Sequence, residues 1–347
     1  MKRVYIANTG GTIGMKWSPR GYCPEAGFLE SQMAKMPELK APGMPEFVIE
    51  EFDPLLDSSN MTPRDWIAIG RRLMAHRDDF DGFIVVHGTD TMAYSASALS
   101  FALRGLAKPV IFTGSQIPLV EVRSDARTNL VTALQLAAGS PVPEICLFFG
   151  NQLFRGNRAT KVSAGGFGAF ESPNFPALGT AGVDLQVHWD LVLPPEQGVP
   201  QPRFTEVRPA KVVALKLFPG MPPEILANAL RPPTEGVVLE TYGVGNGPGD
   251  AELLRVLEEA ADRGVVIVNC TQCLYGRVDM EDYATGSALG RAGLTSGSDM
   301  TTEAALAKLF YLLSLGLGVD EVRRQMPRSL RGELTEVATS EPASTSP

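Results

Sequence analysis

Two threonines lie in polar, glycine-containing loops, where a side-chain hydroxyl could act as a nucleophile. Thr12 lies within Thr9-Gly10-Gly11-Thr12-Ile13-Gly14, and Thr89 lies within His87-Gly88-Thr89-Asp90-Thr91. Glycines let the backbone turn tightly and leave N–H groups free to bind an anion or an oxyanion. The glycine spacing matches neither common phosphate-binding pattern, which argues against a nucleotide. We therefore favour a catalytic hydroxyl, with an inert threonine in a glycine loop as the alternative.

Asp90 and Lys161 supply opposite charges that could serve such a hydroxyl. A lysine close to Asp90 would keep the carboxylate ionised, and a deprotonated lysine could act as a base. The alternatives are ordinary ones, because an aspartate before a helix is often its N-cap and a lone lysine is often solvated. Only a shared position in the fold would separate these interpretations.

The remaining reactive side chains carry weaker signals. His87 follows an apolar segment and could be a general base, although a buried structural imidazole is the more frequent case. Cys270 and Cys273 form a C-x-x-C pair, but no second pair or histidine cluster accompanies them. We therefore predict no metal site and no cofactor.

Apolar segments alternate with helix-period segments, which predicts the scaffold for these loops. The expected strands are Val4–Ala7, Phe47–Phe52, Phe83–His87, Val110–Thr113 and Ile145–Phe149, and the expected helices lie near Pro63–His76, Thr91–Arg104 and Ser124–Ala138. Such alternation predicts an α/β fold with a doubly wound, mostly parallel sheet. Ligands bind beyond the carboxyl ends of such strands, where all the polar loops would converge.

The chain is expected to form two domains. Residues 1–185 form the predicted N-terminal domain with the catalytic loops, and the proline-rich residues 186–210 form an interdomain linker that could carry an edge strand. Residues 211–337 form a second, smaller α/β domain, and residues 338–347 are expected to be a disordered tail, because they are rich in Ser, Thr, Pro and Glu.

The composition of the chain indicates which partners and which cellular compartment to expect. The formal net charge of −8 argues against nucleic-acid binding. No stretch approaches the roughly 20 apolar residues of a membrane-spanning helix, and the apolar run at the N-terminus is too short for a signal peptide. Four cysteines are too few for a disulfide framework in a chain of 347 residues. We expect a cytoplasmic protein with a small-molecule substrate.

Together, the loops resemble the bacterial-type L-asparaginase family, in particular its cytoplasmic type I branch. The similar segments are Thr9–Gly14, His87–Tyr94, Thr113–Pro118, Arg155–Arg158, Tyr242–Asn246 and Leu330–Leu334. The likeness runs from residue 3 to about residue 335. It implies hydrolysis of the side-chain amide of free L-asparagine to L-aspartate and ammonia, without a cofactor.

The resemblance also implies roles for particular residues. Thr12 is implied as the nucleophile with Tyr22 on a mobile loop as its partner, and Thr89, Asp90 and Lys161 as a second catalytic cluster. The implied substrate-binding residues are Asp57, Ser58, Ser59, Ser115 and Asn246. Ser58 and Ser59 would hold the α-carboxylate and the α-amine, and Ser115 would contact the leaving amide. Asn246 would complete the site of a neighbouring subunit, which implies a homodimer as the active unit and a homotetramer as the usual assembly.

One feature departs from the type I pattern. Thr160 and Cys273 match two positions of an allosteric asparagine site, but Glu240 stands where that branch can place an arginine that would clamp the ligand's carboxylate. A carboxylate facing a carboxylate is repulsive. We therefore expect asparagine activation to be absent or much weakened.

Two other functions remain as alternatives. One is a related enzyme, either a glutaminase–asparaginase or the amidase-like subunit of a tRNA-dependent amidotransferase. The acidic composition and the absence of an N-terminal extension argue against the amidotransferase subunit. The other is a non-catalytic amino-acid sensor with the same fold, against which the intact set Thr12, Thr89, Asp90 and Lys161 argues.

Overall fold

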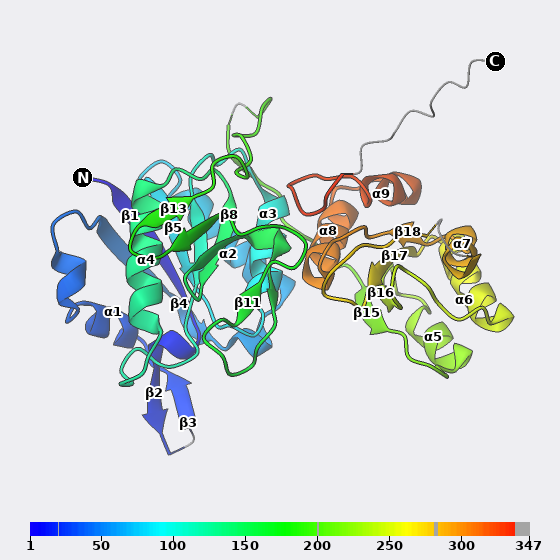
Figure 1. Ribbon diagram of the computed structural model, residues 1–347, viewed down its shortest axis with the longest axis horizontal. Coiled ribbons are helices and arrows are strands. Elements are labelled where there is room, and N and C mark those ends of the chain that lie inside the picture. The colour runs from blue at the N-terminus through cyan, green and yellow to red at the C-terminus, as the bar shows by residue number, and fades with distance from the viewer. Residues whose placement is uncertain (20, 200, 281–283, 337–347) are drawn as a thin grey trace.

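The structure is a computed structural model in which residues 1–19, 21–199, 201–280 and 284–336 are described. The predicted tail at 338–347 lies outside these residues. Within them, the larger part of the chain forms an eight-stranded sheet and the smaller part a four-stranded sheet (Figure 1). No helix among the described residues is long and apolar enough to cross a membrane.

Five adjacent strands of the large sheet are parallel. Their order is β4 (Glu46–Leu56), β1 (Arg3–Gly10), β5 (Gly82–Val86), β7 (Val110–Thr113) and β8 (Ile145–Phe149). The central strands β5, β7 and β8 are buried along their whole length because helices cover both faces. The predicted doubly wound α/β fold is confirmed.

Three helices cover this parallel part. They are α2 (Pro63–Ala75), α3 (Met92–Ala102) and α4 (Ala126–Gly139). Leu130 and Leu134 of α4 pack with Ile6 and Ile84 on one face, whereas α2 and α3 cover the other face. The start of α2 is set by a capping box between Thr62 and Asp65, with Pro63 in the first turn.

Several elements were not expected from the sequence. Beyond β8 the sheet continues antiparallel through β9 (Gln152–Arg155), β12 (Gly179–Ala181) and β13 (Leu185–Val187). Strand β13 spans the predicted domain boundary at residue 185. A hairpin of β2 (Met15–Ser18) and β3 (Gly21–Pro24) projects from the N-terminal domain, before the short helix α1 (Phe28–Met33) (Figure 1).

The second sheet is parallel. Its order is β15 (Val212–Lys216), β16 (Gly236–Thr241), β17 (Val266–Thr271) and β18 (Thr295–Ser296), and its helices are α5 (Pro223–Ala229), α6 (Ala251–Asp262), α7 (Ala284–Arg291), α8 (Thr302–Ser314) and α9 (Val319–Gln325).

Helix α8 packs against α3 and joins the two domains (Figure 1). Phe101 of α3 and Leu309 of α8 belong to one apolar cluster. This contact explains why α3 is buried on nearly every side.

Two further pairs of short strands form outside the two main sheets. Strand β14 (Arg203–Phe204) of the linker pairs with β6 (Leu103–Arg104), which directly follows α3. Strand β10 (Thr160–Lys161) pairs with β11 (Phe170–Glu171). The second pair carries Lys161 to the carboxyl edge of the large sheet.

Candidate active site

A polar pocket of about 210 Å³ opens at the carboxyl edge of the large sheet. Its walls come from the loops after β1, β4, β5 and β7, and from β10. The lining residues are Gly11, Thr12, Met15, Asp57, Ser58, Gly88, Thr89, Asp90, Gln116, Lys161 and Ala164. The fold therefore brings Thr12, Thr89, Asp90 and Lys161 to one place.

Lys161 connects the hydroxyl and the carboxylate of the second loop. Its Nζ lies 2.8 Å from Thr89 Oγ1 and 2.7 Å from Asp90 Oδ1. The Lys161 side chain is 20% exposed, whereas that of Asp90 is 61% exposed. The lysine is thus held inside the pocket by its partners, and the carboxylate keeps a solvated face for a ligand.

The loop that carries Thr12 closely approaches the loop that carries Thr89. Gly11 has φ 91°, and a Cβ atom there would lie 2.4 Å from the backbone nitrogen of Gly88. Only glycine fits this position, because both the backbone conformation and the space exclude a side chain. The glycine segment therefore places Thr12 beside Thr89.

His87 is a buried, neutral support for the second loop. Its Nδ1 lies 2.7 Å from the carbonyl oxygen of Gly88, and its Nε2 lies 2.8 Å from Ser95 Oγ. Trp66 Nε1 also donates to Ser95 Oγ at 3.1 Å. Burial lowers the pKa of His87 to about 4. Since a carbonyl requires a donor, Nδ1 carries the proton, and the ring holds Gly88 in place rather than facing the pocket.

Four predicted site residues do not line the pocket. Tyr22 lies on β3 and donates to Glu121 Oε1 at 2.8 Å. Ser115 is buried and donates to the carbonyl of Ile117. Ser59 is exposed and its N–H donates to Asp57, which itself lines the pocket beside Ser58. The fourth, Asn246, lies in the second domain, where it accepts a hydrogen bond from Thr285.

Gln116 is a pocket residue to which the sequence assigns no role. Its amide contacts Thr89 Oγ1 at 3.3 Å and the carbonyl of Gly166 at 3.0 Å. Its position directly after a predicted buried strand was the available signal.

A second pocket of about 250 Å³ lies between the domains and is lined by all three predicted allosteric residues: Thr160, Glu240 and Cys273. Its walls also include Glu303, which accepts from Thr160 Oγ1 at 2.7 Å. Burial raises the pKa of Glu303, and the charge of Glu240 adds to the effect. Strand β10 thus has Thr160 in this acidic pocket and Lys161 in the polar one.

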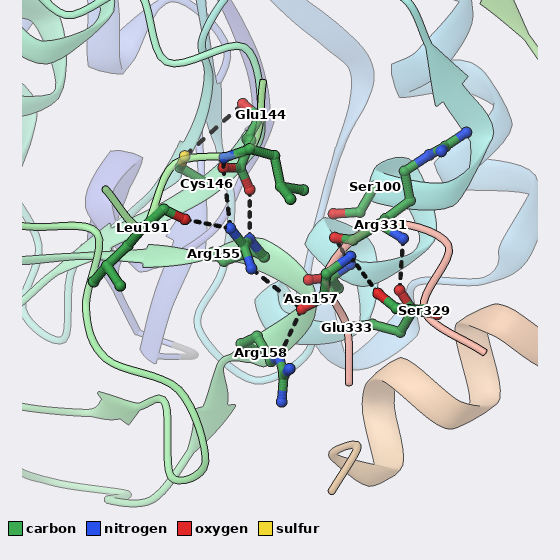
Figure 2. A network of polar contacts seen from close by, with 12 residues as sticks. Ser100, Glu144, Cys146, Arg155, Asn157, Arg158, Leu191, Ser329, Arg331 and Glu333 are labelled. Carbon is green, nitrogen blue, oxygen red and sulfur yellow. Dashed lines mark hydrogen bonds and ion pairs between the residues drawn. The ribbon is translucent and has the colours of Figure 1, made fainter. Parts of the chain in front are cut away.

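The segment before β10 is clamped to the C-terminal part of the chain (Figure 2). Arg158 forms a buried ion pair with Asp299 at 3.0 Å and donates from Nε to the carbonyl of Gly332 at 2.6 Å. Asn157 donates to the carbonyl of Arg331 at 3.0 Å. Arg155 pairs with Glu144 at 2.5 Å, which anchors the same segment to the large sheet. These contacts fix the backbone from which Lys161 extends.

A larger cavity of about 390 Å³ lies beside this clamp, near the amino ends of β7 and β8. None of the predicted site residues lines it. Its charged lining is balanced between cations and anions: Lys108, Arg155 and Arg331 against Glu144, Glu196 and Glu336. This cavity is larger than the polar pocket, but the reactive groups gather in the smaller one.

Fold and pocket together define a two-domain α/β protein with a hydroxyl, lysine and carboxylate cluster suited to acyl transfer. Within the described residues, no group of three or more His, Cys, Asp or Glu side chains could hold a metal ion.

Comparisons with known proteins give the family. Residues 3–193 match the family described as "Asparaginase, N-terminal", and residues 211–326 match the "Glutaminase/Asparaginase C-terminal domain". The chain belongs to the asparaginase family, as the sequence motifs predicted.

Individual relatives cover nearly the whole chain. L-asparaginase 1 of Escherichia coli K12 is 51% identical over 335 residues, which are 96% of this chain and 98% of the relative. A mouse protein named 60 kDa lysophospholipase is 43% identical over 97% of this chain and 63% of its own length. The crystal structure of L-asparaginase I from Vibrio cholerae superposes with a TM-score of 0.90 at 50% identity, covering 96% of this chain and 99% of that one.

Proposed function

We infer that this protein is an L-asparaginase, which hydrolyses the side-chain amide of free L-asparagine to L-aspartate and ammonia. The observation that carries this inference is the pocket in which Lys161 donates hydrogen bonds to Thr89 and Asp90, and which Thr12 also lines. Amide hydrolysis needs an activated hydroxyl, donors for the oxyanion and a route for a proton to the leaving nitrogen. The hydroxyls of Thr12 and Thr89 and the amine of Lys161 support these roles, and no step of the proposed reaction needs a cofactor.

Thr12 is the proposed nucleophile. Its Oγ1 bonds to the amide carbon, the C–N bond breaks, and the nitrogen leaves as ammonia after taking up the hydroxyl proton. Water then cleaves the ester to give aspartate and restore the hydroxyl. Direct attack of water on the amide is the competing route.

Tyr22 is the proposed partner of Thr12 in proton transfer. Its hydroxyl donates a hydrogen bond to Glu121, and this hydrogen bond raises the pKa of Tyr22. The proposed role therefore requires hairpin β2–β3 to release Glu121 when substrate binds.

Thr89, Asp90 and Lys161 act together as the proposed second cluster, which orients the reacting group and the attacking water. Asp57, Ser58 and Ser59 follow β4 at the same edge of the sheet and are proposed to bind the amino-acid end of the substrate. Ser115 is proposed to present its backbone to the amide.

The assembly proposed for activity is a homodimer within a homotetramer, because Asn246 lies away from the pocket of its own chain. We place the enzyme in the cytoplasm. Asparagine activation through the inter-domain pocket is proposed to be absent or much weakened, because the carboxylate of Glu240 opposes the carboxylate of an amino acid.

A direct assay tests the function. Ammonia release is measured from free asparagine, free glutamine and aminoacylated tRNA under identical conditions. We expect asparagine to be turned over with the highest kcat/KM. Faster release from tRNA would favour the amidotransferase alternative, and binding of asparagine without ammonia would favour the amino-acid sensor.

A further inference from the structure

Gln116 joins the reacting cluster to a neighbouring loop through both ends of its amide. Oε1 accepts from Thr89 Oγ1 at 3.3 Å, and Nε2 donates to the carbonyl of Gly166 at 3.0 Å. The orientation of the amide is fixed by this second contact, because a carbonyl oxygen can face only the NH₂ end. The oxygen end must then face Thr89.

The backbone of Gln116 is fixed as firmly as its side chain. Its N–H lies 3.1 and 3.0 Å from the two carboxylate oxygens of Asp125, and the N–H of Ile117 lies 3.1 Å from the first of them. Asn129 donates to the carbonyl of Gly114 at 2.9 Å. These contacts attach the turn after β7 to the start of α4, so Gln116 meets Thr89 from a rigid position.

A threonine hydroxyl has one hydrogen and two lone pairs. At Thr89 the hydrogen points to Gln116, and one lone pair receives the hydrogen bond from Lys161. The second lone pair is left for a ligand in the pocket. Toward that ligand, Thr89 can therefore accept a hydrogen bond but cannot donate one.

We propose that Gln116 is a positioning residue that holds Thr89 as a hydrogen-bond acceptor, and thereby favours the substrate amide over the product carboxylate. The inference rests on the proposed function. The amide of asparagine carries two N–H hydrogens, whereas the carboxylate of aspartate carries none and repels a second acceptor. Asp90 beside Thr89 strengthens the same preference. Product release is favoured by the hydrogen bonding already present in the resting site.

Substitution of Gln116 by Leu or Met tests this claim, because both keep the bulk and remove the amide oxygen. The freed hydroxyl can then turn toward the pocket and donate to a carboxylate. We expect the dissociation constant for aspartate, measured by titration calorimetry, to fall about tenfold, the worth of one hydrogen bond to a charged group. The KM for asparagine should not fall with it. Gln152→Leu, at the exposed first position of strand β9, is the matched control and should leave both values unchanged.

The decisive measurement is a double-mutant cycle with Thr89→Val, which removes the hydroxyl. Aspartate binding does not require turnover, so all variants can be compared. We expect Gln116→Leu to have no effect on aspartate affinity in the Thr89→Val background. An equal effect in both backgrounds, or no gain in aspartate affinity for either Gln116 variant, would overturn the role of Gln116 while the enzyme still hydrolyses asparagine. A wild-type protein that neither hydrolyses asparagine nor binds aspartate would overturn the proposed function and this role together.

Discussion

At the scale of single residues, Thr12 and Thr89 have different surroundings, although both line one pocket. Thr89 is already bonded to Lys161 and Gln116. Thr12 lies in a glycine segment pressed against Gly88. A hydroxyl held by two partners is suited to orient a reacting group, which leaves Thr12 as the proposed nucleophile.

Removing either hydroxyl should therefore abolish most of the activity. Thr12→Ala and Thr89→Val are each expected to lower kcat by roughly three orders of magnitude or more, because members of one catalytic unit fail together. Ammonia release gives kcat, and the melting temperature verifies the fold. Thr180→Ala, on the exposed part of β12, should retain full activity. Near-normal turnover in either pocket variant would show that the substituted threonine does not have its proposed catalytic role.

His87 makes the stability of the protein sensitive to acid. Its pKa falls from an ordinary 6.5 to about 4 in the fold. Between those pH values the unfolded chain binds a proton that the native chain does not, so stability is full above pH 6.5 and falls toward pH 4. The loss amounts to about 3 kcal/mol.

Urea unfolding at pH 7 and pH 4.5 measures this loss. His87→Gln should be less stable than wild type at pH 7 but should lose less stability on acidification. The exposed His188→Gln should follow the wild type. An identical pH dependence for His87→Gln and wild type would show that another group is responsible.

The sequence also placed Thr12, Thr89 and Asp90, because each of them follows a predicted strand and parallel strands end at one edge. Lys161 reaches this edge on β10, a strand that the sequence did not predict. The sequence could not place Tyr22 or Gln116. The position of Tyr22 depends on a hairpin with little apolar alternation, and the role of Gln116 depends on an amide orientation set by Gly166, fifty residues away in the chain.

At the scale of elements, periodicity predicted the parallel strands well. Val110–Thr113 and Ile145–Phe149 have the predicted bounds. The antiparallel strands β9, β12 and β13 were missed because they are short and rich in polar residues or glycine, which weakens the alternating pattern. Arg331 lies in a loop and pairs with Glu196 at 3.1 Å. That pairing joins residues far apart in the sequence.

The Lys308–Glu333 pair holds α8 to the C-terminal segment. Nζ lies 2.6 Å from Oε1, and both side chains are fully buried. Burial lowers the pKa of Lys308. Removing Lys308 leaves the buried carboxylate of Glu333 without its cation, with only the backbone N–H groups of Leu330 and Arg331 as partners, so Lys308→Met is expected to cost roughly 3–5 kcal/mol of folding stability.

Chemical denaturation of the single and the double variant measures these losses of folding stability. Lys308→Met combined with Glu333→Leu should lose less than the single substitution, since no charge is left behind. Glu259→Gln, which breaks an exposed pair with Arg255, should cost no more than about 1 kcal/mol. If Lys308→Met costs no more folding stability than Glu259→Gln, water must reach the buried pair.

At the scale of the whole molecule, strand β10 connects two pockets, because Thr160 lines the inter-domain pocket and Lys161 the polar one. A ligand in the first pocket could therefore influence the second. In this chain, however, the carboxylate of Glu240 lines that pocket and opposes any carboxylate that enters.

We expect saturation by asparagine to be hyperbolic, with a Hill coefficient of about 1. Initial rates over a wide range of asparagine concentration measure it. Glu240→Arg, which reverses the charge, is expected to introduce a sigmoidal response, and Cys23→Ser, outside the pocket, is not. A clearly sigmoidal curve for the wild type would contradict the expected loss of activation.

The active site is proposed to need residues from two chains. Asn246 lies in the second domain and does not line the pocket of its own chain, so its proposed role requires a second subunit. Thr12→Ala and Asn246→Ala should each be poorly active alone. In a mixed dimer, however, one site combines an intact Thr12 from one chain with an intact Asn246 from the other. Mixing the two variants by unfolding and refolding together should therefore restore up to half of the wild-type activity per mixed dimer. If the mixture stays as inactive as its components while gel filtration shows that the chains have exchanged, Asn246 acts within its own chain, and the active unit needs no partner.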